Sequence, residues 1–281
     1  MRRLLIFGLG YTGAAIAAEA RAAGFTVVAT SRSSAPGCIA FDAADAEVRA
    51  ATHIVTTAAP DAAGDPVLAR YAQAIDAAPA LRWIGYLSST VVYGNRDGGW
   101  VDEDTPPNPT QPRGHRRVAA ENAWSAFAGK VAVDIFRLAG IYGPGRSSFD
   151  DLRAGRARRM IKPGHQFGRI HQDDIALAIV AAMRQAQPPG RRIFNLADDE
   201  PSESAAVVTH AAALLCVPPP PEVAFADALP SMSPMAGSFW AENRKVASDK
   251  TKAALGLTWR YPNFRDGLSA ILLKERGDRP V

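Results

Sequence analysis

Short apolar runs separated by amphipathic or Ala-rich stretches dominate residues 4–196 of the chain. The first run, at 4–7, leads through a Gly-rich turn into an Ala-rich stretch. Further β-branched or apolar runs follow at 25–30, 39–42, 53–60, 81–90, 130–138 and 191–196. Helical patterns lie between them at 66–77, 116–128 and 173–183. Strands that alternate with helices are typical of βαβ units, so the pattern predicts an α/β fold of the Rossmann type, with a doubly wound parallel sheet.

The turn after the first predicted strand contains Gly8, Gly10 and Gly13, in the spacing Gly-x-Gly-x-x-Gly. The first glycine suits a tight turn, the second lets backbone N–H groups approach a pyrophosphate, and the third lets the helix lie close to the strand. Tyr11 and Thr12 open that helix, and a helix N-terminus favours phosphate. Because this spacing also arises by chance, it predicts a dinucleotide site only together with support from elsewhere in the chain.

The tip of the second predicted strand carries Ser31, Arg32 and Ser33 and no carboxylate. Dinucleotide sites place at this tip either an acid for the free ribose 2′-OH of NAD or an Arg for the 2′-phosphate of NADP. The tip therefore favours NADP, with NAD as second choice; an Arg that is merely solvated is the alternative interpretation. Further predicted cofactor contacts stand where the next two runs end: Asp42, Ala58 and Ala59.

Composition indicates a protein without membrane spans. The chain has 281 residues, of which 47% are hydrophobic and 21% charged, and it contains no apolar run long enough to cross a bilayer. Met1-Arg2-Arg3 before an apolar run also resembles the start of a secretory signal. Glu19 and Arg21 interrupt that run in the register of an amphipathic helix, however. With Cys38 and Cys216 far apart, we expect reduced thiols and a cytoplasmic location.

The charge of the chain is mildly basic and unevenly distributed. A net charge of +4 hints at anionic ligands but is too small for a nucleic-acid-binding footprint. Basic residues gather between Arg146 and Arg169, which predicts a clamp on an anionic substrate, with a solvated surface as the alternative. His165 and His171 have no third ligand at a suitable spacing, so no metal site is predicted.

The order of the predicted elements divides the chain into a nucleotide-binding core and a smaller substrate lobe. A proline-rich break in the pattern near residue 220 separates the late segments from the core. The expected parts are a core at 1–140 to which 171–198 returns, a lobe at 141–170 and 199–260, and a terminal helix at 261–281. Residues 95–113, rich in Gly, Pro, Asp and Asn, are predicted to form a long functional loop.

Four later motifs, together with the first βα turn, give the chain a recognisable pattern from end to end. They are Ser-Ser-Thr-Val-Val-Tyr-Gly at 88–94, Arg-Leu-Ala-Gly-Ile-Tyr-Gly-Pro-Gly-Arg at 137–146, Arg-Ile-His-Gln-Asp-Asp-Ile-Ala at 169–176 and Phe-Asn-Leu-Ala-Asp-Asp-Glu-Pro at 194–201. In their order and spacing they resemble the extended short-chain dehydrogenase/reductase family, specifically atypical members of its NAD-dependent epimerase/dehydratase group. The resemblance implies that Ser89 hydrogen-bonds the reacting oxygen, and it is compatible with a homodimer.

The chain departs from that family at its Tyr-x-x-x-Lys pair. Aligning Ala119-Ala120-Glu121 with the end of the family motif puts Arg113 at the Tyr position and Arg117 at the Lys position, and Tyr-x-x-x-Lys occurs nowhere in the sequence. A guanidinium stays protonated, so Arg113 cannot act as a general acid or base, whereas Arg117 can still bind a ribose. Candidate replacements for the proton-transferring group are Tyr93, Tyr142 and His115, the last with an exposed loop position as the alternative.

Three functions follow from these residues. The first is an NADP-dependent oxidoreductase or epimerase/dehydratase-like enzyme on a small polar or nucleotide-linked anionic substrate. The second is a dinucleotide-sensing protein without turnover, and the third is an anion-binding interaction protein that has lost the cofactor. The glycine pattern and Arg32 argue against the third. The predicted substrate contacts are Ser89, Thr90, Arg113, Tyr142, Arg146 and Arg169.

Overall fold

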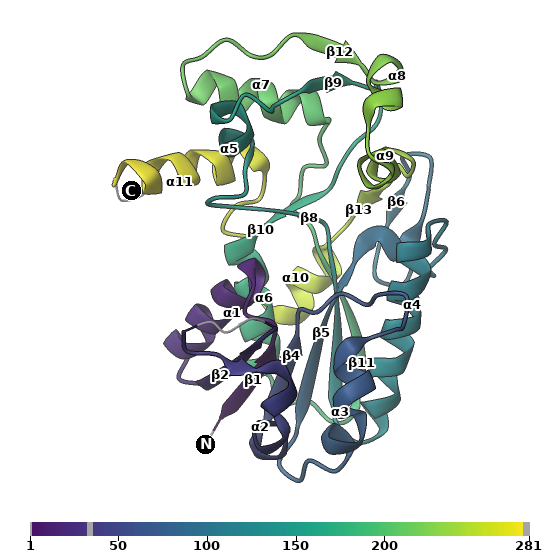
Figure 1. The fold of residues 1–281 in the computed structure, drawn as a ribbon, viewed down its shortest axis with the longest axis vertical. Coiled ribbons are helices and arrows are strands. Elements are labelled where there is room, and N and C mark those ends of the chain that lie inside the picture. The colour runs from purple at the N-terminus through teal and green to yellow at the C-terminus, as the bar shows by residue number, and fades with distance from the viewer. Residues whose placement is uncertain (1, 33–35, 278–281) are drawn as a thin grey trace.

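A seven-stranded parallel sheet forms the centre of the molecule (Figure 1). The computed structural model describes residues 2–32 and 36–277, so the predicted cofactor contact Ser33 lies outside the described residues. The strand order is β11-β7-β5-β4-β1-β2-β3. This order reverses direction beside β1, which is the arrangement of a doubly wound Rossmann fold. The predicted fold class is confirmed.

The strands of the central sheet are short apolar segments that lie between layers of helices. Their bounds are β1 Arg3–Phe7, β2 Thr26–Ser31, β3 Ile39–Ala40, β4 His53–Thr56, β5 Trp83–Ser89, β7 Ala132–Leu138 and β11 Gly190–Leu196. In the register, Leu5 of β1 lies opposite Val28 of β2 on one side and Ile54 of β4 on the other. Continuous apolar strands of this kind are expected where both faces of a parallel sheet are buried.

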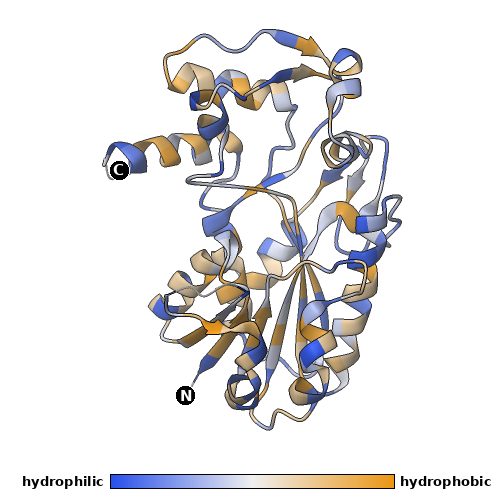
Figure 2. Ribbon diagram, viewed as in Figure 1, coloured by the Kyte–Doolittle hydropathy of each residue, from blue (hydrophilic) through white to orange (hydrophobic). Residues whose placement is uncertain are grey.

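Helices cover both faces of the sheet (Figure 2). Each face has its own cluster of buried apolar side chains. On one face, side chains such as Ile6, Phe136 and Phe194 meet α1, α6 and α10; on the other, Leu5, Ile84 and Ile135 meet α2, α3 and α4. The bounds of these helices are α1 Tyr11–Ala22, α6 Gln172–Arg184, α10 Asp249–Leu255, α2 Asp45–Ala50, α3 Pro66–Asp76 and α4 Pro112–Ser125.

Small paired strands and further helices lie above the carboxyl ends of the sheet strands (Figure 1). The strand pairs are β8 Gly140–Tyr142 with β10 Arg169–His171, β9 Arg159–Ile161 with β12 Glu222–Ala224, and β6 Trp100–Val101 with β13 Lys245–Val246. The helices are α5 Ser148–Arg153, α7 Ser204–Leu214, α8 Phe225–Ala228, α9 Pro234–Trp240 and α11 Phe264–Arg276. A third apolar cluster joins α5, α7 and α11. Among the described residues, no helix is long and apolar enough to cross a membrane.

Three segments differ from the sequence prediction. The run at 39–42 forms only the two-residue strand β3, because the chain turns at once into a 3-10 helix over Phe41–Ala43. The helix expected from residue 116 begins at Pro112, where the missing proline N–H costs no helical hydrogen bond. The predicted loop at 95–113 also contributes β6 to the pair with β13.

A buried ion pair fastens α4 to the sheet. Glu121 of α4 accepts hydrogen bonds from Arg137 Nη2 of β7 at 2.8 Å and from Ser88 Oγ of β5 at 2.6 Å. Glu121 and Arg137 are 3% and 2% exposed. A carboxylate at this depth is tolerated because a cation and a hydroxyl both reach it.

Asp198, just after β11, lacks comparable partners. It is 1% exposed, and neither carboxyl oxygen has a hydrogen-bond partner among the residues that the structure describes. Burial raises the pKa of this carboxyl to about 8, although Arg169 acts in the opposite direction. The folded protein therefore keeps a proton on Asp198 near neutral pH, where an unfolded chain has lost it.

The first prediction concerns the close approach of α1 to β1. A Cβ at position 13 would lie 2.2 Å from the Gly8 carbonyl oxygen, so Gly13→Ala must push backbone apart. We expect a loss of about 3 kcal/mol in the free energy of unfolding, at the upper end for overpacked sites, measured by urea denaturation. Gly129→Ala, where a Cβ meets nothing within 4 Å, is the control and should stay within about 0.5 kcal/mol of wild type. Equal stability of the two variants contradicts this packing.

The second prediction is the pH dependence of stability that Asp198 contributes. Because its pKa is raised on folding, the folded state binds the extra proton, and the free energy of unfolding falls as pH rises towards about 8. Relative to wild type, Asp198→Asn should therefore gain about 1.4 kcal/mol between pH 7 and pH 9. The comparison is made by urea denaturation across that range. The range from pH 7 to pH 9 lies above the pKa values of His53, His165 and His171, each of which is lowered to about 4.

A distant, exposed carboxyl provides the control for this measurement. Asp151 is exposed and pairs with Arg156 Nη2 at 3.1 Å. The difference between Asp151→Asn and wild type should stay constant from pH 7 to pH 9. A constant difference for Asp198→Asn as well would mean that its carboxyl is ionised in the folded protein.

Candidate functional site

A cavity of about 590 Å³ opens at the carboxyl ends of β1, β2 and β4, around the Gly-rich turn. We call it the glycine-turn cavity, and it is lined by Phe7, Gly8, Leu9, Gly10, Thr30, Ser31, Arg32, Phe41, Thr57, Ala58, Ala59, Asp61 and Pro66. Gly8 has φ +100°, and a Cβ there would lie 2.5 Å from Thr57 Oγ1; a Cβ on Gly10 would meet nothing within 4 Å. The turn is thus tight at Gly8 and open at Gly10, as a pyrophosphate requires.

Half of the predicted cofactor contacts line this cavity. They are Gly8, Gly10, Ser31, Arg32, Ala58 and Ala59. Thr12 and Gly13 are instead buried in the first turns of α1. Asp42 is exposed on the 3-10 helix after β3 and does not line the cavity, because the turn at residue 41 brings Phe41 there in its place. For Asp42, the predicted contact has no support in the geometry.

Tyr11 lies between the glycine turn and the segment that follows β8. Its hydroxyl is buried without a hydrogen-bond partner among the described residues. A Cβ on Gly143 would lie 2.5 Å from that oxygen. Arg146 places its guanidinium 5.7 Å from the centre of the Tyr11 ring. Tyr11 and Arg146 therefore contact each other, although neither lines the glycine-turn cavity.

Residues that the sequence analysis did not single out complete the cavity. Thr57 donates its hydroxyl to the Gly8 carbonyl at 2.8 Å and so braces the turn. Asp61 lines the cavity from the end of β4, while its carboxylate accepts from the Ala63 N–H at 2.7 Å. Thr57 directly follows β4, in the fourth apolar run. A polar residue at the end of a strand is the sequence signal for a side chain at the sheet edge where ligands bind.

A second cavity, of about 460 Å³, opens beyond β5 and β7, below α9. We call it the arginine cavity, and its lining is Ser89, Thr90, Val91, Arg113, Leu138, Ala139, Gly140, Ile141, Tyr142, Met160, Gln166, Phe167, Gly168, Arg169, Ser204, Phe239, Trp240, Glu242, Arg244 and Val246. Of the predicted substrate contacts, Arg146 is the one that does not line it.

Ser89 and Thr90 stand at the carboxyl end of β5. The chain leaves the strand there in a 3-10 turn, Thr90–Tyr93, and the Ser89 hydroxyl accepts from the Val91 N–H at 3.3 Å. This bond uses the oxygen as an acceptor and leaves the hydroxyl proton available. Ser89 can therefore donate to an oxygen in the cavity.

Arg113 and Arg117 occupy successive turns of α4 but have separate environments. Arg113 lines the arginine cavity with its guanidinium 4.0 Å from the centre of the Phe239 ring. Burial lowers the pKa of Arg113, with Glu242 acting in the opposite direction. Arg117 donates from Nη1 to Tyr86 Oη at 3.0 Å and to the Leu87 carbonyl at 2.8 Å, and it does not line the cavity.

Tyr142 and Arg169 come from the paired strands β8 and β10 and line the cavity from above the sheet. Tyr142 is 8% exposed, and its hydroxyl reaches the Asn263 carbonyl at only 3.4 Å. Burial raises the pKa of this phenol. Burial lowers the pKa of Arg169, whose Nη1 donates to the carbonyls of Phe167 and Ser202. Arg169 thus brings a positive charge to the cavity, whereas the Tyr142 hydroxyl faces the Asn263 carbonyl and Gly267 of α11.

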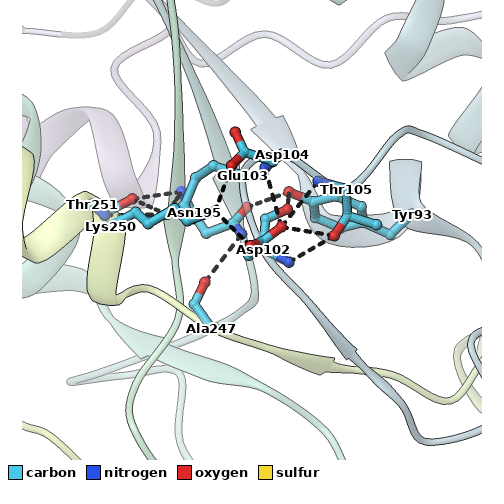
Figure 3. Close-up of polar contacts among 9 residues, drawn as sticks. All are labelled: Tyr93, Asp102, Glu103, Asp104, Thr105, Asn195, Ala247, Lys250 and Thr251. Atoms are coloured by element: carbon cyan, nitrogen blue, oxygen red, sulfur yellow. Dashed lines mark hydrogen bonds and ion pairs between the residues drawn. The ribbon is translucent and has the colours of Figure 1, made fainter.

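The two other candidate proton donors lie elsewhere. Tyr93 is fully buried, and its hydroxyl donates to Asn195 Oδ1 at 2.7 Å and lies 2.9 Å from the Asp102 carbonyl (Figure 3). Burial raises its pKa. His115 is exposed on α4 and lines neither cavity. The geometry gives Tyr93 a structural position and supplies no path from His115 to the arginine cavity.

The segment around α9 supplies wall residues that the sequence analysis did not single out. Glu242 is 5% exposed; it accepts from Thr110 Oγ1 at 2.6 Å and from Arg244 Nη1 at 2.8 Å. Phe239 and Trp240 come from α9. The only available signal was the aromatic and charged cluster at 239–245, which follows a stretch without clear periodicity.

Solved structures of other proteins share this fold over nearly the whole chain. A functionally unknown conserved protein from Silicibacter pomeroyi DSS superposes with a TM-score of 0.89 at 41% identity, covering 98% of this chain and 99% of its own. MoeE5 in complex with UDP-glucuronic acid and NAD gives 0.76 at 21% identity, covering 98% and 99%. The human epimerase family protein SDR39U1 with NADPH gives 0.76 at 18% identity, covering 96% and 98%.

Sequence comparison finds a shorter match. Protein YeeZ of Escherichia coli (strain K12) is 35% identical over 114 residues, which span 40% of this chain and 38% of YeeZ. No protein-family model matches the chain. Identity of 41% over almost all of both chains places this protein in one family with the Silicibacter pomeroyi protein, and its fold is that of NAD-dependent epimerase/dehydratase proteins.

Proposed function

We propose that this protein binds NADP(H) and acts as an oxidoreductase or epimerase/dehydratase-like enzyme on a small polar or nucleotide-linked anionic substrate. The observation that carries the proposal is the position of the two cavities at neighbouring strand ends. Ala58 and Ala59, after β4, line the glycine-turn cavity, and Ser89 and Thr90, at the end of the paired strand β5, line the arginine cavity. Ligands of doubly wound sheets bind at this edge.

The residues around the glycine turn fit a dinucleotide. The space above Gly10 admits a pyrophosphate to the N-terminus of α1, where the backbone N–H groups and the helix dipole favour negative charge. The solved complexes of MoeE5 with NAD and SDR39U1 with NADPH support a nicotinamide dinucleotide in this fold. Arg32, at the tip of β2 in the cavity wall, favours the 2′-phosphate of NADP.

The reaction we propose divides its tasks among residues of the arginine cavity. A bound nicotinamide supplies or accepts the hydride. Ser89 donates a hydrogen bond to the reacting oxygen of the substrate, and Arg113 binds an anionic group. Of the three candidate proton donors, Tyr142 is the one that lines this cavity, and we assign the proton transfer to it; its hydroxyl must leave the Asn263 carbonyl to reach the substrate.

A dinucleotide-sensing protein without turnover is the second candidate. The observation in its favour is that Arg113 and Arg117 replace the Tyr-x-x-x-Lys pair, while Tyr93 is committed to Asn195. Such a protein retains the glycine turn and Arg32 and has no need of Ser89. Nucleotide binding and turnover therefore have to be measured separately.

The third prediction tests the nucleotide. Wild-type protein should bind NADPH more tightly than NADH in a fluorescence titration, and Arg32→Gln should weaken NADPH binding about 10- to 100-fold, because a charge-assisted hydrogen bond contributes about 1.5–3 kcal/mol. Binding of NADH should hardly change. Arg21→Gln, an exposed change near the far end of α1, is the matched control. Equal affinities for the two nucleotides in both proteins rule out the role of Arg32.

The fourth prediction separates enzyme from sensor. With NADPH and a panel of small anionic aldehydes and ketones, Ser89→Ala should lower kcat about 100- to 1,000-fold, as loss of a donor to a reacting oxygen does, while NADPH affinity stays unchanged. Turnover is followed by the absorbance of NADPH. Ser204→Ala, which removes another hydroxyl from the same cavity wall, is the control. Full activity of Ser89→Ala would place the chemistry elsewhere.

A further inference from the structure

The positive charges of the arginine cavity are only partly compensated. Three guanidiniums, those of Arg113, Arg169 and Arg244, line it, and Glu242 is the one carboxylate among the lining residues that the structure describes. Glu242 is bound to Arg244, both side chains being largely buried. That pair neutralises itself, so the charges of Arg113 and Arg169 remain.

Arg113 and Arg169 form no ion pair with a carboxylate among the described residues, and Glu242, the carboxylate of the cavity lining, pairs with Arg244. The Nε of Arg113 is buried with no hydrogen bond to any described residue. Arg169 is oriented by the carbonyl oxygens of Phe167 and Ser202, which fix the guanidinium and leave its charge intact. The nearby Asp198 carboxyl keeps its proton near neutral pH, since burial raises its pKa to about 8.

Apolar side chains also line the cavity, and they come from α9 and from the segment before β10. Figure 1 labels both elements. Trp240 packs edge-on against Phe167, with ring centres 4.8 Å apart, and stacks on Phe225 at 5.2 Å. Phe239 lies on the guanidinium of Arg113 yet remains 50% exposed. A large ring that is half exposed at a cavity offers apolar surface for a ligand to cover.

We propose that the substrate of the arginine cavity is an amphipathic anion: a carboxylate or phosphate held by Arg113 and Arg169, carried on an aromatic or similarly apolar body that packs on Phe239 and Trp240. This inference rests on the proposed function, in which the same cavity takes the substrate. A neutral apolar molecule would leave two desolvated guanidiniums without a counter-ion, and an inorganic anion would leave the aromatic side chains exposed to water. A ligand with both an anionic and an apolar part pairs with the guanidiniums and covers the aromatic side chains. The cavity has the size of a small-molecule site.

Calorimetric titration with four probes tests the assignment: phenyl phosphate, phenylacetate, inorganic phosphate and benzyl alcohol. At least one of the two aromatic anions should bind more tightly than inorganic phosphate and than benzyl alcohol. A preference between phenyl phosphate and phenylacetate identifies the anionic group. If neither exceeds inorganic phosphate, or if benzyl alcohol binds as well as both, the inference is overturned.

Two variants separate the anionic from the apolar contact. Arg113→Gln should weaken the aromatic anions and inorganic phosphate alike, by about 10- to 100-fold. Phe239→Ser, at a half-exposed position where folding is not at risk, should weaken only the aromatic probes. Arg156→Gln is the matched control, because Arg156 is exposed, pairs with Asp151 and lies outside the cavity. Equal loss of both probe types in Phe239→Ser, or none in Arg113→Gln, contradicts the arrangement.

Parallel titrations with NADPH distinguish a failure of this inference from a failure of the proposed function. If NADPH binds and no aromatic anion does, the ligand class is wrong and the nucleotide assignment stands. If aromatic anions bind with the expected response to Arg113→Gln while NADPH does not bind, the ligand class stands and the proposed function is wrong.

Discussion

The close contact between Gly13 and the carbonyl of Gly8 sets the geometry of the glycine-turn cavity. The carbonyl oxygen lies where a side chain at position 13 would begin, so α1 starts directly against the end of β1. That closeness aims the N-terminus of α1 across the carboxyl edge of the sheet. Thr57 fixes the same turn from β4 by donating to the Gly8 carbonyl. The turn between β1 and α1 is therefore held by one backbone contact and one side-chain hydrogen bond, and neither Gly8 nor Gly13 has room for a larger residue.

A second constraint positions α4 and with it Arg113. Glu121 joins α4 to Ser88 of β5 and to Arg137 of β7 in a buried cluster. Buried pairs of this kind contribute little net stability compared with apolar packing, but breaking one is expensive. Their effect is to fix one arrangement of the helix on the sheet. Arg113, two turns before Glu121, is thereby carried to the arginine cavity, while Arg117 faces the end of β5.

The parts that the sequence predicted are those with strong local signals. Buried parallel strands are continuous apolar runs, and a glycine with positive φ beside a helix start leaves a recognisable spacing, so the sheet and the glycine-turn cavity were predictable. The position of Asp42 away from the cavity could not be predicted, because its run is only two residues of strand and then a turn. The contacts of Tyr93 could not be predicted either, because its partners Asp102 and Asn195 lie on separate segments. Local patterns do not reveal such long-range contacts.

The wall formed by residues 225–246 was the least predictable part, for a related reason. Short helices and a two-residue strand show little hydrophobic periodicity. The side chains of this segment are placed by contacts with residues far away in the sequence: Phe239 with Arg113, Glu242 with Thr110, and Trp240 with Phe167. A guanidinium in the place of a tyrosine cannot exchange protons, but it can hold an anion against a desolvated wall. In the function that we propose, position 113 therefore serves substrate binding instead of proton transfer. The proton then has to come from a neutral hydroxyl, and Ser89 and Tyr142 are the lining residues to which we assign that part of the reaction.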